Sequence, residues 1–249
     1  MSLEIIWFGL VASLLAGLAT GVGALPVLLM RRVSDRLLNS MLGFSAGIML
    51  AATFFSLLDP AIELGGVWIA VFGIMLGAVA LHLADRFIPH FHPVSGTEGP
   101  SSRLSRVWLF ALAVTIHNFP EGLAVGVSFG GGDVTTGLVV AMAIGLQNMP
   151  EGLAVALPLL GEGYSKRRSL WYATLTGLAE PVGGFLGVTL VYIFHSILSW
   201  ALAFAAGAML FVISDEVIPE THRKGFERGA TFSLIVGFIV MMLLDCILT

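Results

Sequence analysis

The chain has 249 residues, of which 57% are hydrophobic and only 11% are charged. Its mean hydropathy is +0.96, whereas soluble proteins carry about 25% charged residues. So few charges cannot cover a soluble globule of this size, which excludes a water-soluble enzyme. The net charge of −4 indicates little about the class of protein. The 30 glycines and 10 methionines favour an all-α integral membrane protein. The single cysteine, Cys246, excludes a disulfide framework and a thiolate metal cluster.

Eight stretches are long and apolar enough to cross a bilayer as helices, which requires about 20 mostly apolar residues. They lie at about residues 5–30, 38–58, 66–85, 107–130, 135–160, 170–194, 198–218 and 230–248. The first is not expected to be a cleaved signal peptide, because it carries Glu4 and lacks a basic leader. No linker separates two folding units, so residues 1–249 are expected to form a single transmembrane domain.

The basic residues define the expected topology. All 12 Lys and Arg residues fall in connections from an odd-numbered span to the next even-numbered span. They are Arg31, Arg32, Arg36, Arg86, Arg103, Arg106, Lys166, Arg167, Arg168, Arg223, Lys224 and Arg228. Short loops rich in Lys and Arg stay in the cytoplasm. Both termini are therefore expected outside the cytoplasm, in a cell membrane that would be the inner membrane of a bacterium. The long connection 89–106, rich in Pro, Gly and Ser, is expected to be flexible.

Two pairs of segments repeat within the chain. Residues 44–50 (FSAGIML) and 204–210 (FAAGAML) match at five of seven positions, and residues 117–125 (HNFPEGLAV) and 147–155 (QNMPEGLAV) match at seven of nine. In each pair the two spans run in opposite directions. The pattern predicts an inverted repeat of spans 1–3 and 6–8 around a central pair, spans 4 and 5. Secondary transporters often have this plan, with the substrate bound near the midplane.

Three glutamates lie within apolar spans, where ionisable groups are costly and usually mark an ion or substrate pathway. Glu121, Glu151 and Glu180 each fall near the middle of a span. A single such glutamate can simply hydrogen-bond a neighbour, but three of them, two in duplicated motifs, argue against a purely structural role. Carboxylates at one depth repel each other unless they take up protons or a cation. The sequence therefore predicts a metal site halfway through the membrane.

Imidazole and amide groups accompany these carboxylates. His117 and Gln147 each precede a glutamate by four residues and share its helix face. Asn118 and Asn148 lie at the adjacent edge of each helix. This donor set suits Zn²⁺ and also accepts Fe²⁺, Mn²⁺, Co²⁺ or Cd²⁺. Met49, in the repeated segment of span 2, has two interpretations, a soft thioether ligand or a packing residue.

Other polar residues lie near the ends of the spans. One group, toward the cytoplasmic end of span 7, either passes the ion on or forms a solvated helix end: Asp215, Glu216, Glu220 and His222. His90 and His92, in the connection 89–106, form a weak metal-binding pair and are expected to be exposed to solvent. Asp245, near the outer end of span 8, has no assigned role.

Three motifs resemble the signatures of one transporter family. Residues 117–121 (HNFPE), 147–151 (QNMPE) and 177–181 (GLAEP) are similar to spans 4, 5 and 6 of the ZIP (Zrt-/Irt-like) divalent metal transporters. Residues 214–222 (SDEVIPETH) resemble the bacterial GufA-like branch of that family. The resemblance extends over essentially the whole chain.

This resemblance implies a homodimer of eight-helix protomers that moves divalent metal, usually zinc, toward the cytoplasm through a binuclear centre. One site would use His117, Glu121, Gln147 and Glu151, with Met49 as an optional further ligand. The second would use Asn118, Asn148 and Glu180, with Glu121 and Glu151 as bridging ligands. The family also implies an elevator-like motion of spans 1, 4, 5 and 6 against spans 2, 3, 7 and 8.

The chain departs from the family pattern in span 5, where many relatives carry His or Asp and this sequence has Gln147 and Asn148. Three carboxylates with one divalent ion leave a formal charge of −1, and a second ion changes it to +1. We therefore expect the first site to be the stronger one and the second to be partly occupied or regulatory.

The expected function is a secondary transporter, driven by the ion gradient and membrane potential alone or by proton exchange. A GxxxxGK[ST] motif for an ATP-driven pump does not occur. A metal-selective channel would use the same ligands. An intramembrane metal-dependent hydrolase is less favoured, because the sequence lacks the HExxH motif. Expected partners are divalent metal ions, the lipid bilayer and a second copy of the chain, with no nucleic acid and no enzymatic cofactor.

Overall fold

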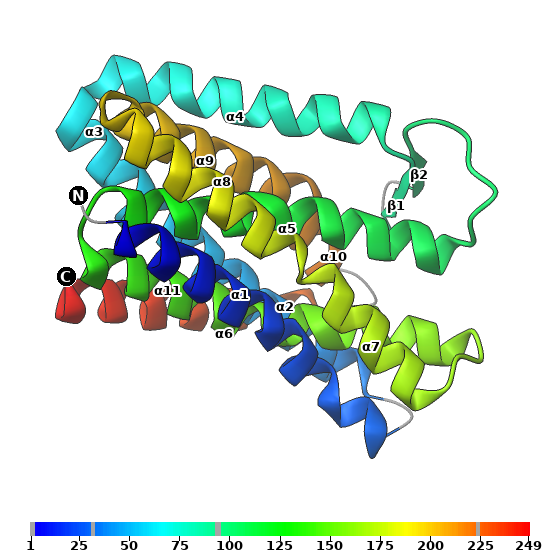
Figure 1. Cartoon of the computed structure of the whole chain (residues 1–249). Coiled ribbons are helices and arrows are strands. Elements are labelled where there is room, and N and C mark those ends of the chain that lie inside the picture. Colours follow the sequence, from blue (N-terminus) through cyan, green and yellow to red (C-terminus); the bar gives the residue numbers. More distant parts are fainter. Residues whose placement is uncertain (1–2, 31–32, 93–95, 223–224) are drawn as a thin grey trace.

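The computed structural model describes residues 3–30, 33–92, 96–222 and 225–249. In this part of the chain, eight helices are long and apolar enough to cross a membrane, which confirms the predicted number of spans. They cover Glu4–Leu28, Asp35–Gly65, Val67–Phe87, Arg106–Gly130, Val134–Gly161, Lys166–Ile193, His195–Thr221 and Glu227–Leu248. Both termini lie at one end of the bundle beside α3 (Figure 1), which we call the terminal end. We call the opposite end, where α7 begins at Lys166, the basic end.

The first four spans, and the connection between the third and the fourth, contain the following elements. They are α1 (Glu4–Ala24) with a 3-10 turn (Leu25–Leu28), α2 (Asp35–Ala52) with a π-helical turn (Thr53–Leu58), α3 (Asp59–Gly65), α4 (Val67–Phe87), β1 (His90–His92), β2 (Gly96–Glu98) and α5 (Arg106–Gly130). The remaining spans contain α6 (Val134–Gly161), α7 (Lys166–Thr176), α8 (Ala179–Ile193), a 3-10 turn (His195–Ile197), α9 (Leu198–Val212) with a π-helical turn (Ile213–Val217), α10 (Ile218–Thr221) and α11 (Glu227–Leu248).

Polar side chains begin several of these helices. Ser34 and Ser165 accept hydrogen bonds from the backbone N–H groups of Leu37 and Arg168, and Asp133 accepts one from Thr135. The backbone N–H groups in the first turn of a helix have no partner within that helix, and each of these side chains accepts a bond from one of them.

The sixth span is interrupted, although the sequence predicted one stretch over 170–194. α7 ends at Thr176 and α8 begins at Ala179. The break places Glu180 in the first turn of α8, where the helix dipole favours a negative charge. By contrast, α5 and α6 continue through Pro120 and Pro150.

The spans pack in pairs around a buried centre. α5 packs along α8, α1 along α6, α2 along α11 and α4 along α9. The central α5 and α6 have 67% and 72% of their most apolar stretch buried, whereas α4 and α11 have 22% and 11%. The two peripheral helices expose large apolar side chains such as Trp68, Phe72 and Phe232. These two helices therefore suit contact with lipid.

The connection after α4 contains a short β-hairpin. β1 pairs antiparallel with β2, and His90 lies opposite Glu98. The prediction that His90 and His92 are exposed to solvent is wrong, since their exposed fractions are 0% and 5%. Strand pairing turns alternate side chains to one face, and β1 packs with this face against the bundle beside α5. The composition of the segment indicated a flexible loop and gave no sign of this docking.

Close glycine packing holds α2 against α11 and generates a stability prediction. A Cβ built on Gly47 would meet the Leu234 carbonyl and the Phe238 amide. We expect Gly47→Ala to force the helices apart and to cost about 1–3 kcal/mol of stability, measured as a lower thermal unfolding temperature in detergent. Gly161 has open space around its α-carbon, so Gly161→Ala should keep the wild-type temperature. Equal unfolding temperatures for the two variants would contradict this packing.

Candidate metal site and cavity

The seven polar residues predicted to form the midplane site are all buried inside the bundle. They come from α5, α6 and the first turn of α8. They are His117, Asn118, Glu121, Gln147, Asn148, Glu151 and Glu180. Three helices therefore bring these side chains into the interior of the protein.

The three glutamates of this set lie close enough for their charges to interact. Glu121 interacts with both Glu151 and Glu180, and Glu180 also interacts with Glu151. Asn148 Nδ2 donates a hydrogen bond of 2.6 Å to Glu180 Oε1. Ser45 of α2 lies on the other side, with its Oγ 3.5 Å from Glu151 Oε1. The carboxylates thus form one electrostatic unit inside the bundle.

Several buried polar atoms of the set have no hydrogen-bond partner within the described residues. They are both carboxylate oxygens of Glu121, both side-chain amide atoms of Asn118 and of Gln147, Asn148 Oδ1 and Glu180 Oε2. A buried polar atom without a partner costs about 1–3 kcal/mol. A cation ligated by the free oxygens removes this cost, so the donor set has the chemistry of a cation site.

Met49 is fully buried, in an apolar cluster that also contains Met209 and Ala206. Packing of the Met49 side chain among apolar neighbours is sufficient to explain its buried position. Its role as a thioether ligand therefore stays a prediction.

Glu216, to which the sequence gave no definite role, lies at the centre of the polar contacts. It comes from the π-helical turn of span 7, and only 7% of it is exposed. His117 Nε2 lies 2.5 Å from its Oε1, and His92 Nδ1 lies 2.7 Å from its Oε2. The rings of His92 and His117 are parallel, with centroids 6.0 Å apart. Glu216 therefore joins the hairpin to α5. In the sequence it was one of three carboxylates within residues 215–220, and nothing there singled it out.

His90 belongs to a second cluster of potential ligands at the basic end. The ligand atoms of His90, His92 and Glu98 lie within 4.8 Å of one another, the one such group of three found among the described residues. His90 Nε2 lies 3.8 Å from Asp85 Oδ1 and 3.9 Å from Glu98 Oε2, while its Nδ1 contacts the Ile88 carbonyl at 2.7 Å. Nδ1 can donate to that carbonyl, as the non-ligating ring nitrogen of a metal-bound histidine does, which leaves a lone pair on Nε2 at the side of the two carboxylates.

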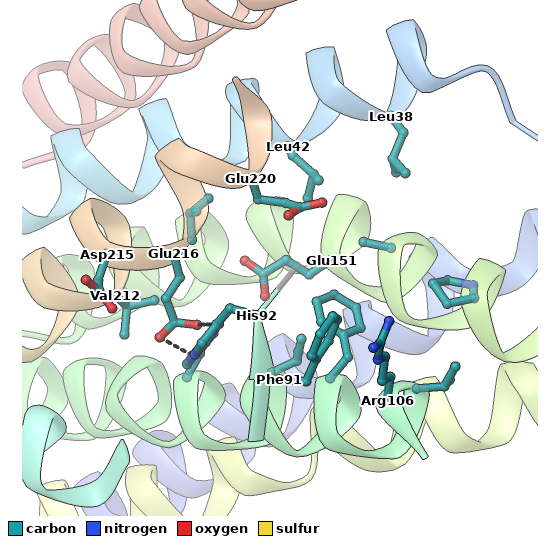
Figure 2. Close-up of a pocket in the computed structure, with 17 residues that line it drawn as sticks. Leu38, Leu42, Phe91, His92, Arg106, Glu151, Val212, Asp215, Glu216 and Glu220 are labelled. Carbon is teal, nitrogen blue, oxygen red and sulfur yellow. Dashed lines mark ion pairs between the residues drawn. The ribbon is translucent and has the colours of Figure 1, made fainter. Parts of the chain in front are cut away.

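A cavity of about 310 Å³ connects the midplane to the basic end. Glu151 and His117 line its inner part, and Arg106 and Phe91 line its mouth. In Figure 2 the side chains of Glu151, Glu216 and Glu220 converge on this space from two sides. The Arg106 guanidinium lies 5.7 Å from the centre of the Phe91 ring. Through this cavity the buried carboxylates of Glu151 and Glu216 are connected to one end of the bundle.

Eight membrane-length helices, with buried carboxylates among them and a cavity that leads to one end, define a multi-pass membrane protein. A family model described as the ZIP zinc transporter matches residues 94–245. The chain belongs to this family.

Relatives in bacteria and animals match nearly the whole chain. The zinc transporter GufA of Myxococcus xanthus is 46% identical over 95% of this chain and 97% of its own length. The zinc transporter ZIPB of Bordetella bronchiseptica is 45% identical over 91% of this chain and 77% of its own length. The human zinc transporter ZIP11 is 36% identical over 91% of this chain and 93% of its own length. The resemblance stated from the motifs is confirmed.

The contacts of Glu216 predict that its charge holds the hairpin in place. Glu216→Gln keeps the shape of the side chain and removes the ion pairs with His92 and His117. Because hydrogen bonds to charged groups contribute about 1.5–3 kcal/mol, amide hydrogen exchange at residues 88–92 should become at least about tenfold faster, measured by mass spectrometry. Asp215, its exposed neighbour in the same turn, provides the control. If Asp215→Asn accelerates exchange equally, or if neither variant does, the assignment is incorrect.

Proposed function

We propose that the chain is a secondary transporter that moves divalent metal ions, zinc first among them, across the membrane toward the cytoplasm. The observation that carries this proposal is the group of three interacting glutamates inside the bundle, one of which, Glu151, lines a cavity that reaches one end. Family membership supports transport rather than enzymatic catalysis, and the relatives are zinc transporters by name.

The orientation in the membrane is inferred from charge. Lys and Arg residues concentrate in connections that stay in the cytoplasm, and the described ones include Arg106 and Lys166 at the basic end. The basic end then faces the cytoplasm, and both termini face outside. With this orientation the cavity opens toward the cytoplasm, which is the side on which transport toward the cytoplasm would release the ion.

The bound ions would occupy two adjacent positions. The first uses His117, Glu121, Gln147 and Glu151, with Met49 as an optional ligand, and the second uses Asn118, Asn148 and Glu180. Glu121 and Glu151 bridge the two positions. The interactions of Glu121 with both other glutamates support this bridging role.

Release would proceed through Glu216. This carboxylate contacts His117 at 2.5 Å and also lines the cavity. A departing ion can exchange the imidazole for the Glu216 carboxylate without crossing an apolar gap. His92 and Asp85 lie beyond Glu216 in the direction of the basic end and supply further ligand atoms. Carboxylates and imidazoles release protons when they bind metal. Metal transport can therefore be coupled to a movement of protons in the opposite direction.

The motion that opens the other side would slide spans 1, 4, 5 and 6 against spans 2, 3, 7 and 8. Glycine packing supports this division. Contacts that leave no room for a Cβ join α1, α5, α6 and α8 to one another, α2 to α11, and α4 to α9. Each group is thus tightly packed internally. A homodimer in a bacterial inner membrane is consistent with the exposed apolar faces of α4 and α11.

Flux measurements on purified protein in liposomes that contain a zinc-sensitive dye test the transport proposal. We expect saturable zinc uptake that falls at least about tenfold in Glu121→Ala, because the variant removes the bridging carboxylate. Glu63→Ala removes an exposed carboxylate of α3 and should leave uptake unchanged. Flux that rises linearly with zinc concentration would indicate a channel, and uptake by Glu121→Ala at the wild-type rate would refute the site.

The two positions should differ in affinity for zinc. Calorimetric titration should resolve one strong site and one weaker site, because Gln147 and Asn148 add no negative charge to offset a second ion. Asn148→Asp adds a carboxylate beside Glu180 and should tighten the weaker site. Two equally tight sites in the wild-type protein would contradict this order.

A further inference from the structure

Thr20 of α1 is a buried polar residue that neither of the proposed metal positions uses. Its exposed fraction is 0%, and its hydroxyl oxygen has no hydrogen-bond partner among the described residues. Threonines inside helices often donate to a backbone carbonyl of the preceding turn, as Thr53, Thr115 and Thr174 do in this protein. Thr20 departs from this local pattern.

The carbonyl that Thr20 would use binds a side chain of the metal site instead. This carbonyl belongs to Ala16, and it accepts a hydrogen bond of 2.9 Å from Asn148 Nδ2. The same nitrogen donates at 2.6 Å to Glu180 Oε1. Asn148 and Glu180 are ligands of the second proposed metal position. The segment of α1 from Ala16 to Thr20 therefore borders that position.

Glycines on two neighbouring segments bring Thr20 close to the glutamates. A Cβ built on Gly152, the residue after Glu151, would overlap the Thr20 carbonyl oxygen. A Cβ built on Gly177 would lie 2.8 Å from the Thr20 hydroxyl oxygen. The Gly177 carbonyl accepts a hydrogen bond of 3.2 Å from the backbone N–H of Glu180. The hydroxyl thus lies at the break between α7 and α8, directly before Glu180.

A second residue of α1 also contacts this glutamate. A Cβ built on Gly17 would lie 3.4 Å from the Cβ of Glu180. Residues three or four apart lie on the same face of a helix, so Gly17 and Thr20 share one face of α1. This face is directed toward Glu180 and its partner Asn148.

Two acceptor atoms of the second metal position lack partners, as the hydroxyl does. They are Glu180 Oε2 and Asn148 Oδ1, and Thr20 makes no hydrogen bond to either of them within the described residues. A hydroxyl can accept two hydrogen bonds as well as donate one. A cation with a water ligand satisfies all three groups, because the cation binds the two acceptors and its water donates to the hydroxyl.

We propose that Thr20 is a positioning residue of the second metal position, where its hydroxyl accepts a hydrogen bond from a water ligand of a partly hydrated divalent cation. This proposal rests on the transport function proposed above. Groups that hydrogen-bond the ligands of a metal fix the orientation of those ligands, and their loss typically weakens metal binding tenfold or more. Thr20 therefore acts through the bound water and not as a direct ligand.

Packing alone does not explain a threonine at this position. Valine has nearly the same shape and has no hydroxyl that is left without a partner. If only the volume of the side chain mattered, valine would make the protein more stable. The hydroxyl of Thr20 is thus unfavourable for folding, which supports a role in binding.

Zinc titration of Thr20→Val tests this role, because the substitution removes the hydroxyl and keeps the shape of the side chain. Calorimetry should show about tenfold weaker zinc binding at the weaker site, with the stronger site unchanged. Thr20→Ser keeps the hydroxyl and should retain the wild-type affinity. Without zinc, the unfolding temperature of Thr20→Val should equal or exceed that of the wild-type protein, whereas loss of a purely structural contact would lower it.

Thr189 of α8 provides a matched control. Its hydroxyl oxygen is also buried without a partner among the described residues. It follows Glu180 in the same helix by about two and a half turns, so Thr189→Val should leave both zinc affinities unchanged. If both valine variants weaken zinc binding equally, or if Thr20→Val binds as the wild-type protein does, the role of Thr20 is refuted.

Zinc flux into liposomes separates this proposal from the transport function. If the wild-type protein transports zinc and Thr20→Val keeps both affinities, the role of Thr20 fails and transport stands. If the wild-type protein gives no flux, the transport function itself fails. A titration that shows a single zinc site in the wild-type protein would refute the second position and the role of Thr20 with it.

Discussion

Three carboxylates buried together at the middle of a membrane protein repel one another and lose their hydration. The arrangement is stable only when protons or a cation neutralise it. In this protein Glu121, Glu151 and Glu180 interact with one another inside the bundle. The surrounding polar groups, the interrupted sixth span and the cavity are all consistent with supplying and removing such a cation.

The requirement for close helix packing follows from that arrangement. The carboxylates can meet only if α5, α6 and α8 approach one another closely, and Gly122 lies directly against the Glu180 carbonyl for this reason. The break between α7 and α8 also contributes, because it places Glu180 in the positive first turn of a helix. Small residues and a discontinuous helix thus position the charges at the intersection of three spans.

Much of this arrangement could be predicted from the sequence, because lipid imposes strong constraints on a chain that crosses it. Span number follows from length and hydropathy, and the buried positions of Glu121, Glu151 and Glu180 follow from the absence of charge around them. The motifs around His117 and Gln147 were sufficient to indicate the family. The role of Glu216 was not predictable, since its two histidine partners come from β1 and α5, and nothing in local sequence links them. His90 and His92 were placed in solvent because a polar loop normally lies there.

By itself, the sequence determined that the protein has eight spans, that its carboxylates lie at mid-depth and that positive charge gathers at one end. These properties depend on each segment separately and on its transfer from water to lipid. Only the tertiary structure decided that a cavity lies at the basic end. The cavity is lined by residues of β1, α2, α5, α6 and the seventh span, so its position depends on how these elements pack against each other and not on any one segment.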